Sequence, residues 1–303
     1  RELTAAVRWA RERGAPITVL GGGSNILVSE VGVRGLVVHA ALLGRSFSAA
    51  AGSAVELRAC AGESWDDVVR ESVERGLRGI ENLSGIPGLV GATPIQNVGA
   101  YGVEVSERIV SVEALDTEAM CERVFNVEEC AFRYRDSFFK TGEGKRFIVT
   151  AVTYRLESEG ALDLSYRDVR EYFARQGAEP TLREVREAVL AIRGRKFPDV
   201  DRVGTAGSFF KNPIVSAEHY AKLKAAYPSA PAYGAGDGLM KIPAGWLIEH
   251  VARMRGARDG SVGTSEHHAL ALVNYGSARA GEVIAFARRI QDAVSNATGI
   301  ELE

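Results

Sequence analysis

The feature that most constrains this chain is the long segment at residues 79–105, which is rich in loop-forming residues. A connection of this length is uncommon in a compact domain unless it binds something. We therefore expect a domain in which a binding loop is held by surrounding strands and helices. The glycines and prolines that punctuate the segment are Gly85, Pro87, Gly88, Gly91, Pro94, Gly99 and Gly102.

The length of 303 residues and the balance of charge set the broad class of protein. At roughly 150 residues per domain, the chain is long enough for two domains with their own cores. Lysine and arginine number 37 against 39 aspartates and glutamates, so no positive charge is in excess and we expect no nucleic-acid partner. No run approaches the roughly 18 apolar residues that a membrane span needs, and the first residues do not build a signal peptide. We expect a cytoplasmic monomer that acts on small molecules.

Hydrophobic patterns predict an α+β fold in both halves of the chain. Helical spacing of apolar residues predicts helices at 3–13 and 64–74, and short apolar runs predict strands at 17–20, 35–39, 55–60, 109–114 and 147–156. A helix at 181–192 precedes a break at 196–199, and the domain boundary is expected at 196–201. The remainder is predicted as a smaller α+β domain, with helices at 217–226, 244–253 and 280–297 and a strand at 269–273.

Three cysteines, Cys60, Cys121 and Cys130, form an odd set without CxxC spacing. We expect reduced thiols in the core or at the surface. The sequence therefore predicts neither a disulfide nor a bound metal.

The segment GGGSN at 21–25 follows a predicted strand. Glycines let a backbone turn its N–H groups toward one point, which suits a diphosphate when no large positive charge is supplied. The segment is not the GxGxxG fingerprint of dinucleotide-binding folds, because no helix opens after it. A plain glycine-rich turn is the structural alternative.

The segment GIPGLVGATPIQNVGAYG at 85–102 combines glycines with small apolar, hydroxyl and amide side chains. Such a backbone can lie flat against a planar ring and offer N–H and C=O groups to the ring edge. A flavin or a nucleotide is the natural candidate ligand. A purely structural Ω-loop is the alternative.

Two further residues stand in patterns that suggest chemistry. Ser208 lies between a glycine and two phenylalanines that we expect to exclude water from it. No GxSxG elbow and no evident histidine base accompany Ser208, which disfavours a serine hydrolase and leaves a proton donor or a structural serine. Arg135 can neutralise a carboxylate with its two-pronged guanidinium, or form a surface ion pair with Asp136.

Together, GGGSN, the 85–102 segment, YRDSFFK at 134–140 and GSFFKNP at 207–213 resemble, in this order and spacing, the motifs of the UDP-N-acetylenolpyruvoylglucosamine reductase family. The resemblance covers nearly the whole chain. It implies an FAD-binding domain of the vanillyl-alcohol-oxidase (PCMH) type with two α+β subdomains, followed by a smaller α+β substrate-binding domain. The expected ranges are 1–198, with a subdomain boundary near 42 and a segment like the family's type I form around 158–195, and then 199–303.

The resemblance also implies roles for individual residues. The residues expected to hold the FAD diphosphate are Gly21, Gly22, Gly23, Ser24 and Asn25. Those expected to line the flavin and its linker are Ile86, Ala92, Thr93, Gln96, Asn97, Ala100 and Gly102, and Arg193 is similar to a family arginine near the cofactor. The substrate contacts implied are Tyr166, Lys196, Asn212, Tyr233 and Lys241, each with a surface side chain or loop anchor as its structural alternative. His268 stands where type I members can carry a glutamine near the uridine.

The family reaction implies two hydride transfers, from NADPH to FAD and then from FAD to UDP-N-acetylglucosamine enolpyruvate, giving UDP-N-acetylmuramate. Arg135 resembles the arginine that stabilises the enolate, and Ser208 resembles the residue that protonates C2. The family's catalytic C-terminal glutamate would fall two positions after Glu303, and its N-terminal strand would precede Arg1. We expect a chain trimmed at both ends relative to the complete enzyme.

Two other functions remain open at the level of sequence. A flavin oxidase on the same fold would react with oxygen, although Lys196, Tyr233 and Lys241, as expected diphosphate ligands, argue against it. A flavin-binding protein without catalysis is the second alternative, because the expected C-terminal glutamate is missing from the sequence.

Overall fold

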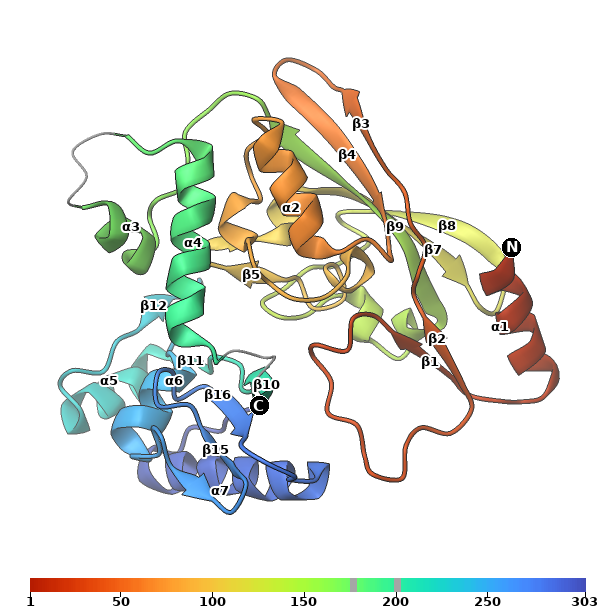
Figure 1. Ribbon diagram of the computed structural model, residues 1–303. Helices are drawn as coiled ribbons and strands as arrows, with labels where there is room; N and C mark the ends of the chain where they lie inside the picture. The colour runs from red at the N-terminus through yellow and green to blue at the C-terminus, as the bar shows by residue number, and fades with distance from the viewer. Residues whose placement is uncertain (175–178, 199–202) are drawn as a thin grey trace. The chain divides into compact units, whose positions relative to one another are not determined.

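The computed structural model describes residues 1–174, 179–198 and 203–303 (Figure 1). Contacts divide the chain into two compact units. The first unit is Arg1–Ser24 with Val33–Arg193, and the second is Asn25–Gly32 with Gly194–Glu303. The predicted split between residues 198 and 199 stays a prediction, and positions 199–201 of the predicted boundary lie outside the described residues.

The first unit opens with one helix and a small parallel sheet. Apolar residues at helical spacing let α1 bury Val7 and Ala10, and β1 pairs in parallel with β2 so that Ile17 lies opposite Leu36. The bounds are α1 Glu2–Glu12, β1 Ile17–Leu20 and β2 Leu36–His39.

The largest sheet of the first unit is antiparallel, with five strands in the order β3-β4-β9-β7-β8 (Figure 1). Helix α2 begins after Ser64, whose hydroxyl accepts the Asp67 N–H at 3.4 Å, and it packs Trp65 against Tyr154 of the sheet. The core between them also holds Leu57, Val68, Ile80 and Leu156. The bounds are β3 Arg45–Ala49, β4 Ala54–Cys60, α2 Trp65–Glu74, β7 Ile109–Asp116, β8 Cys121–Asn126 and β9 Phe147–Glu157.

The long glycine-rich segment is held in place by short turns rather than by long elements. It contains the 3₁₀ turns η1 Glu81–Leu83 and η2 Val90–Ala92 and the two-stranded pair β5 Gly99–Ala100 with β6 Val103–Glu104. Further 3₁₀ turns follow at η3 Val105–Glu107, η4 Phe138–Lys140 and η5 Gly144–Arg146, and helices at α3 Arg167–Phe173 and α4 Leu182–Lys196.

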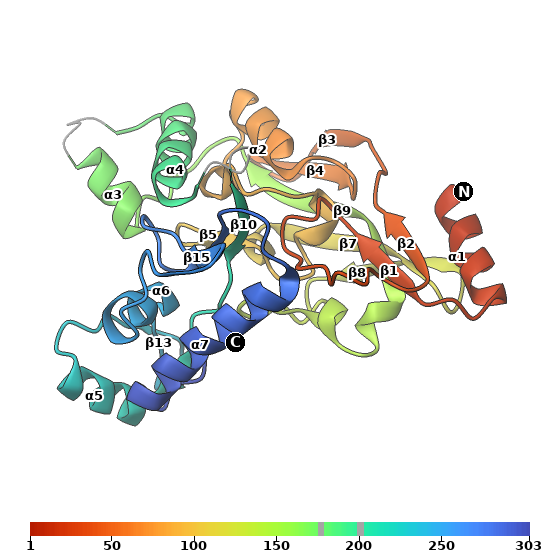
Figure 2. The same ribbon diagram turned by 60° about the horizontal axis from the view of Figure 1, so that its bottom comes forward.

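The second unit has two antiparallel sheets, in the orders β10-β16-β15-β14 and β11-β13-β12. Its long helix α7, conspicuous in Figure 2, packs Phe286 and Ile290 into one core with Val262 and Leu272 of the four-stranded sheet. The bounds are β10 Gly204–Ser208, β11 Ile214–Ser216, α5 Ala217–Ala226, β12 Tyr233–Gly234, β13 Leu239–Lys241, α6 Ala244–Trp246, η6 Leu247–Val251, β14 Arg258–Asp259, β15 Val262–Thr264, β16 Ala271–Asn274 and α7 Ala280–Thr298.

The predicted α+β class is confirmed, but the prediction was wrong for one helix. The helix expected at 244–253 has only a short α-helical start at Ala244–Trp246 and continues as a π-helical turn, Leu247–Val251. No helix among the described residues is long and apolar enough to cross a membrane.

Candidate active site

The glycine-rich turn after β1 lies against the long loop of the first unit. A Cβ on Gly22 would lie 3.1 Å from the Cα of Gly88, and the Ser24 hydroxyl donates to the Pro87 carbonyl at 3.2 Å. Among the described residues, none accepts a hydrogen bond from the main-chain N–H of Gly21, Gly22 or Gly23. We call residues 21–24 the cradle and residues 85–102 the platform. The two touch backbone to backbone, and the cradle retains free N–H donors.

The platform is fixed by the side chains of its own polar residues. The Thr93 hydroxyl donates to the Val90 carbonyl at 2.8 Å and lies 2.7 Å from the Tyr154 hydroxyl. The Asn97 amide donates to Glu104 Oε2 at 2.8 Å and to the Arg133 carbonyl at 3.1 Å. Both Thr93 and Asn97 are buried, so these side chains serve to fix the shape of the platform.

A strained turn presents Arg135 to the platform. Arg133 and Asp136 exchange both main-chain hydrogen bonds, at 3.0 and 3.1 Å, and Arg135 between them has a left-handed φ of 54°. Its guanidinium donates to the carbonyls of Asn97, at 3.1 Å, and Gly99. A non-glycine residue in this conformation costs about 1 kcal/mol or more and is typical of functional positions. The guanidinium is thereby tied to the platform's own backbone.

Two further predicted side chains of the first unit, Tyr166 and Arg193, contact the two ends of the platform. Tyr166 packs edge-on against Tyr101, with ring centroids 5.4 Å apart, and its Cβ lies 3.7 Å from where a Cβ of Gly102 would stand. Arg193 of α4 donates from Nε to the Gly85 carbonyl at 3.1 Å. Burial lowers the pKa of Arg193 and raises the pKa of Tyr101 to about 12, so the phenol stays protonated at neutral pH.

In the second unit, Ser208 ends strand β10 and is exposed, which corrects the expectation that its aromatic neighbours exclude water. Phe210 is buried in the core of this unit and Phe209 packs against that core. The register between β10 and β16 shifts between Thr205 and Ser208, and Gly207 is left-handed there. Such a bulge re-aims a side chain at the end of a strand.

Two other predicted residues surround the start of α6. The Asn212 side chain accepts the Ala244 N–H at 2.9 Å. His268 lies with its Cε1 3.4 Å from where a Cβ of Gly245 would stand, and it meets the ring of Phe197 edge-on at 5.6 Å. Asn212 and His268 therefore share one neighbourhood, at the first turn of α6.

Tyr233 and Lys241 are direct cross-strand partners of β12 and β13. Tyr233 is largely exposed, with 54% of its surface accessible. Lys196 is the last residue of α4 and is partly buried. Asn25, predicted for the cradle, belongs by its contacts to the second unit.

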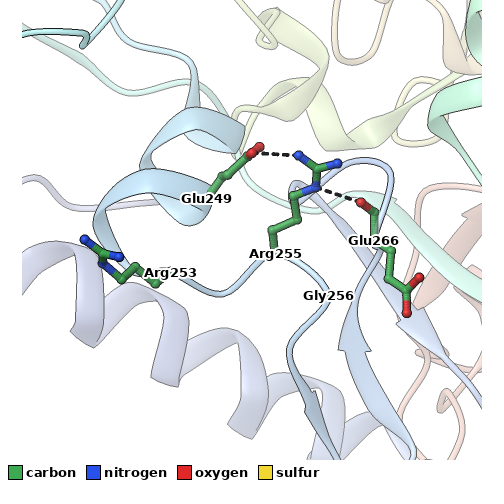
Figure 3. A pocket seen from close by; sticks show the side chains of 5 residues that line it. All are labelled: Glu249, Arg253, Arg255, Gly256 and Glu266. Atoms are coloured by element: carbon green, nitrogen blue, oxygen red, sulfur yellow. Dashed lines mark hydrogen bonds and ion pairs between the residues drawn. The ribbon is translucent and has the colours of Figure 1, made fainter.

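The second unit also has a surface pocket. It is lined by Glu249, Arg253, Arg255, Gly256 and Glu266 (Figure 3). Arg255 donates to Glu249 Oε1 and to the Glu266 carbonyl, both at 2.7 Å, while Arg253 points away from them (Figure 3). None of the residues predicted from the sequence lines this pocket.

Several residues beside the platform were missed by sequence reasoning. Lys140 donates from Nζ to the Arg135 carbonyl at 3.1 Å, and Asp66 accepts the Gly85 N–H at 2.6 Å. The signals in the sequence were Lys140, which ends the YRDSFFK motif, and Asp66, which lies near the start of the helix predicted at 64–74.

Two family models match the chain: an FAD binding domain over residues 1–124 and the C-terminal domain of UDP-N-acetylenolpyruvoylglucosamine reductase over residues 199–303. The reductase of Pseudomonas aeruginosa is 45% identical over 303 residues, covering 100% of this chain and 88% of the relative. The chain belongs to the UDP-N-acetylenolpyruvoylglucosamine reductase family. The reductase of an Azoarcus species is 46% identical over 308 residues, covering 100% of this chain and 87% of the relative. The crystal structure of the Thermus caldophilus reductase matches with a TM-score of 0.62 at 27% identity, covering 97% of this chain and 86% of that one.

The first unit of this reductase family member has the features that FAD binding needs. Among the described residues the cradle offers unpaired N–H donors, and a Cβ on Gly22 would make a tight contact with the backbone of Gly88. The platform presents backbone and small side chains such as Ala92 and Ala100. The predicted combination of a diphosphate cradle and a ring platform is therefore compatible with the residues present.

Proposed function

We propose that this chain reduces UDP-N-acetylglucosamine enolpyruvate to UDP-N-acetylmuramate in peptidoglycan precursor synthesis, with FAD as cofactor and NADPH as hydride donor. The proposal rests on family membership together with the geometry of the first unit. The observation that carries it is the backbone contact between the cradle at Gly22 and the platform at Gly88, which brings N–H donors with no acceptor among the described residues beside the platform backbone.

The chemistry supplied by FAD when bound is the relay of a hydride from NADPH to C3 of the substrate enol ether. The cradle, Gly21 to Ser24, would hold the diphosphate through N–H groups, with Asn25 following it in sequence. The platform would hold the ring system, with Arg193 alongside. The platform residues proposed as contacts are Ile86, Ala92, Thr93, Gln96, Asn97, Ala100 and Gly102.

Arg135 is proposed to stabilise the negative charge that develops at C2 and on the substrate carboxylate. A planar guanidinium can match a carboxylate with two parallel hydrogen bonds, which a lysine ammonium cannot. The carbonyls of Asn97 and Gly99 already orient this guanidinium, so little reorganisation is needed when charge develops.

Ser208 is proposed to deliver the proton to C2. Ser208 is an exposed residue of the second unit and stands at the end of a strand irregularity. A hydroxyl is a weak acid, so this role needs nearby cations that favour the alkoxide. The residues proposed to grip the UDP-sugar are Tyr166, Lys196, Asn212, Tyr233, Lys241 and His268.

The experiment that tests this function follows the visible spectrum of the purified, FAD-reconstituted protein under anaerobic conditions. NADPH is added first and UDP-N-acetylglucosamine enolpyruvate second, with NADH in a parallel sample to test donor specificity. We expect the flavin absorbance to bleach with NADPH and to return with the sugar nucleotide.

Each other outcome points to a different correction. Flavin that bleaches and is reoxidised only by admitted oxygen would indicate an oxidase. Flavin that binds but is not reduced by NADPH would overturn the proposed donor, and a protein that retains no flavin would overturn the proposal as a whole.

A further inference from the structure

Both main-chain polar groups of Gly85, the first residue of the platform, are held by charged side chains. The Gly85 N–H donates to Asp66 Oδ1 of α2 at 2.6 Å, and its carbonyl accepts from Arg193 Nε of α4 at 3.1 Å. The backbone of Gly85 is left-handed, at φ +70°, and a Cβ there would stand 2.7 Å from Leu190 Cδ2. A side chain at this position would be strained by the left-handed φ and would have to displace Leu190, so the platform starts directly against α4.

Asp66 is in turn held by a second arginine of α4. Arg186 donates from Nη1 to Oδ1 at 2.7 Å and from Nη2 to Oδ2 at 2.8 Å, which is the two-pronged geometry of a strong arginine–carboxylate pair. Arg186, Leu190 and Arg193 are spaced four and then three residues apart, so they share one face of the helix. This face fixes Gly85 both directly and through Asp66.

The ion pair of Asp66 and Arg186 is partly shielded from solvent. The Arg186 side chain is 10% exposed and that of Asp66 is 35% exposed. Burial acts to raise the pKa of Asp66, but the Arg186 hydrogen bonds and the Gly85 N–H hold it below its ordinary value. A shielded ion pair adds little net stability over apolar packing, whereas it can specify one arrangement of the groups around it.

The end of the platform reaches the same helix. Arg193, which binds the Gly85 carbonyl, also forms a hydrogen bond with the side chain of Tyr101. Residues 85 and 101 therefore meet at one guanidinium. The nearby ion pair of Asp66 and Arg186 joins α2 to α4 and so fixes where α4 places that guanidinium.

We propose that Asp66 and Arg186 are positioning residues for the cofactor: they fix the Gly85 backbone and so hold the platform in its ligand-ready shape before FAD binds. The inference rests on the proposed function, because it assumes that the platform binds FAD. It assigns to Asp66 of α2 and Arg186 of α4 an indirect part in cofactor binding, through the backbone of Gly85.

The test compares Arg186→Met with Arg183→Met, a matched change at an exposed position of the same helix. Methionine keeps an apolar stem at position 186 and removes all five N–H donors. We expect Arg186→Met to weaken FAD binding by tenfold or more and to alter the fine structure of the bound-flavin absorption band. Hydrogen exchange of the apoprotein should be faster in the peptide that contains Gly85, whereas Arg183→Met should match the wild type in all three measurements.

A second pair of variants separates positioning from simple loss of stability. Asp66→Asn keeps an oxygen that accepts the Gly85 N–H and should retain FAD affinity better than Asp66→Ala, even where both lower the melting temperature. If Arg186→Met fails to fold, the FAD affinity and the flavin spectrum of Asp66→Asn and Arg186→Lys are compared with those of the wild type instead.

The inference is overturned if the variants lower the melting temperature but bind FAD as tightly as the wild type, with the same spectrum, at a temperature where they are folded. A wild-type protein that binds no FAD would instead refute the proposed function, and this inference with it.

Discussion

At the scale of single residues, Arg135 combines backbone strain with a proposed catalytic role. Its left-handed φ of 54° favours glycine, while its guanidinium is bound to two platform carbonyls. We predict that Arg135→Gly and Arg135→Ala both lose about 10²–10³-fold in turnover, because both remove the charge that faces the developing anion. Arg135→Gly should nevertheless be more stable than Arg135→Ala by about 1 kcal/mol, since glycine adopts this conformation freely.

Urea unfolding of the two variants measures the difference in stability, and steady-state kinetics measures turnover. Equal free energies of unfolding for glycine and alanine would show that the turn relaxes and stores no strain. Arg135→Lys should also fail in catalysis, because a point charge cannot replace the planar guanidinium. Near-normal turnover by that variant would remove Arg135 from the mechanism.

Ser208 allows the two half-reactions to be separated. We predict that Ser208→Ala keeps the rate of flavin reduction by NADPH and slows flavin reoxidation by the sugar nucleotide by about 10²–10⁴-fold, the range for loss of a positioned proton donor. Stopped-flow absorbance of each half-reaction provides the measurement. Equal slowing of both half-reactions would contradict the proposed role.

Sequence motifs draw attention to single residues, but they do not show which residues meet in the folded chain. Arg135 and Ser208 lie inside motifs, whereas Asp66 and Arg186 lie 120 positions apart and meet only in the folded chain. Ser208 was wrongly predicted to be shielded from water, because Phe210 is buried in the core of the second unit and Phe209 packs against it, which the sequence alone does not show. The direct pairing of Tyr233 with Lys241 likewise depends on a sheet register that the sequence did not reveal.

At the scale of elements, the contact between cradle and platform depends on the absence of a side chain at Gly22. Gly22→Ala would place a Cβ 3.1 Å from the backbone of Gly88, so the two loops must separate slightly. We predict that this variant loses about 1–3 kcal/mol of stability, as overpacked sites do, together with FAD affinity. Gly21→Ala is the control, because its Cβ would meet only the Ala92 methyl at 3.8 Å. Equal FAD dissociation constants for the two variants, measured by flavin fluorescence, would contradict the proposed contact.

The ion pair between Asp66 of α2 and Arg186 of α4 predicts that the stability of the protein depends on pH. The pKa of Asp66 in the folded protein lies below its ordinary value, so the stabilisation is present above that ordinary value and is lost as pH falls through the lowered one. We expect the gap in unfolding free energy between wild type and Asp66→Asn to be constant above about pH 5 and to narrow below about pH 4. Urea unfolding between pH 3 and pH 7 measures the gap. A gap that stays unchanged down to pH 3 would show that the carboxylate charge of Asp66 does not contribute.

Elements with strong burial were predictable, and edge elements were not. Strands β4, β7 and β9 carry dense apolar patterns and were predicted to within two residues at each end. Strand β3 is mostly exposed, and β8 buries only Phe125, so neither has the pattern that marks a half-buried strand. The glycine-rich strand β10 forms because β16 pairs with it, which is a tertiary effect that local propensity does not contain.

At the scale of the whole molecule, the two units have cores with no residue in common. The largest core of the first unit surrounds Trp65 and Tyr154, and the core of the second unit is built around Leu247 and Ile290. The cradle and the platform both belong to the first unit. A ligand that binds only the folded form of one unit stabilises that unit by mass action, by about 2.7 kcal/mol at a hundred times its dissociation constant.

We therefore predict that excess FAD raises the unfolding midpoint of the first unit and leaves that of the second nearly unchanged. Trp65 is buried in the first core and Trp246 packs against the second, so variants that keep one of the three tryptophans report on each unit separately. Thermal unfolding followed by tryptophan fluorescence, with and without FAD, provides the midpoints, and riboflavin serves as a control for flavin absorbance because it lacks the diphosphate. Equal increases in the unfolding midpoints reported by Trp65 and Trp246 would mean that residues of both units contribute to FAD binding. Asn25, which belongs to the second unit, would then be the first residue to replace.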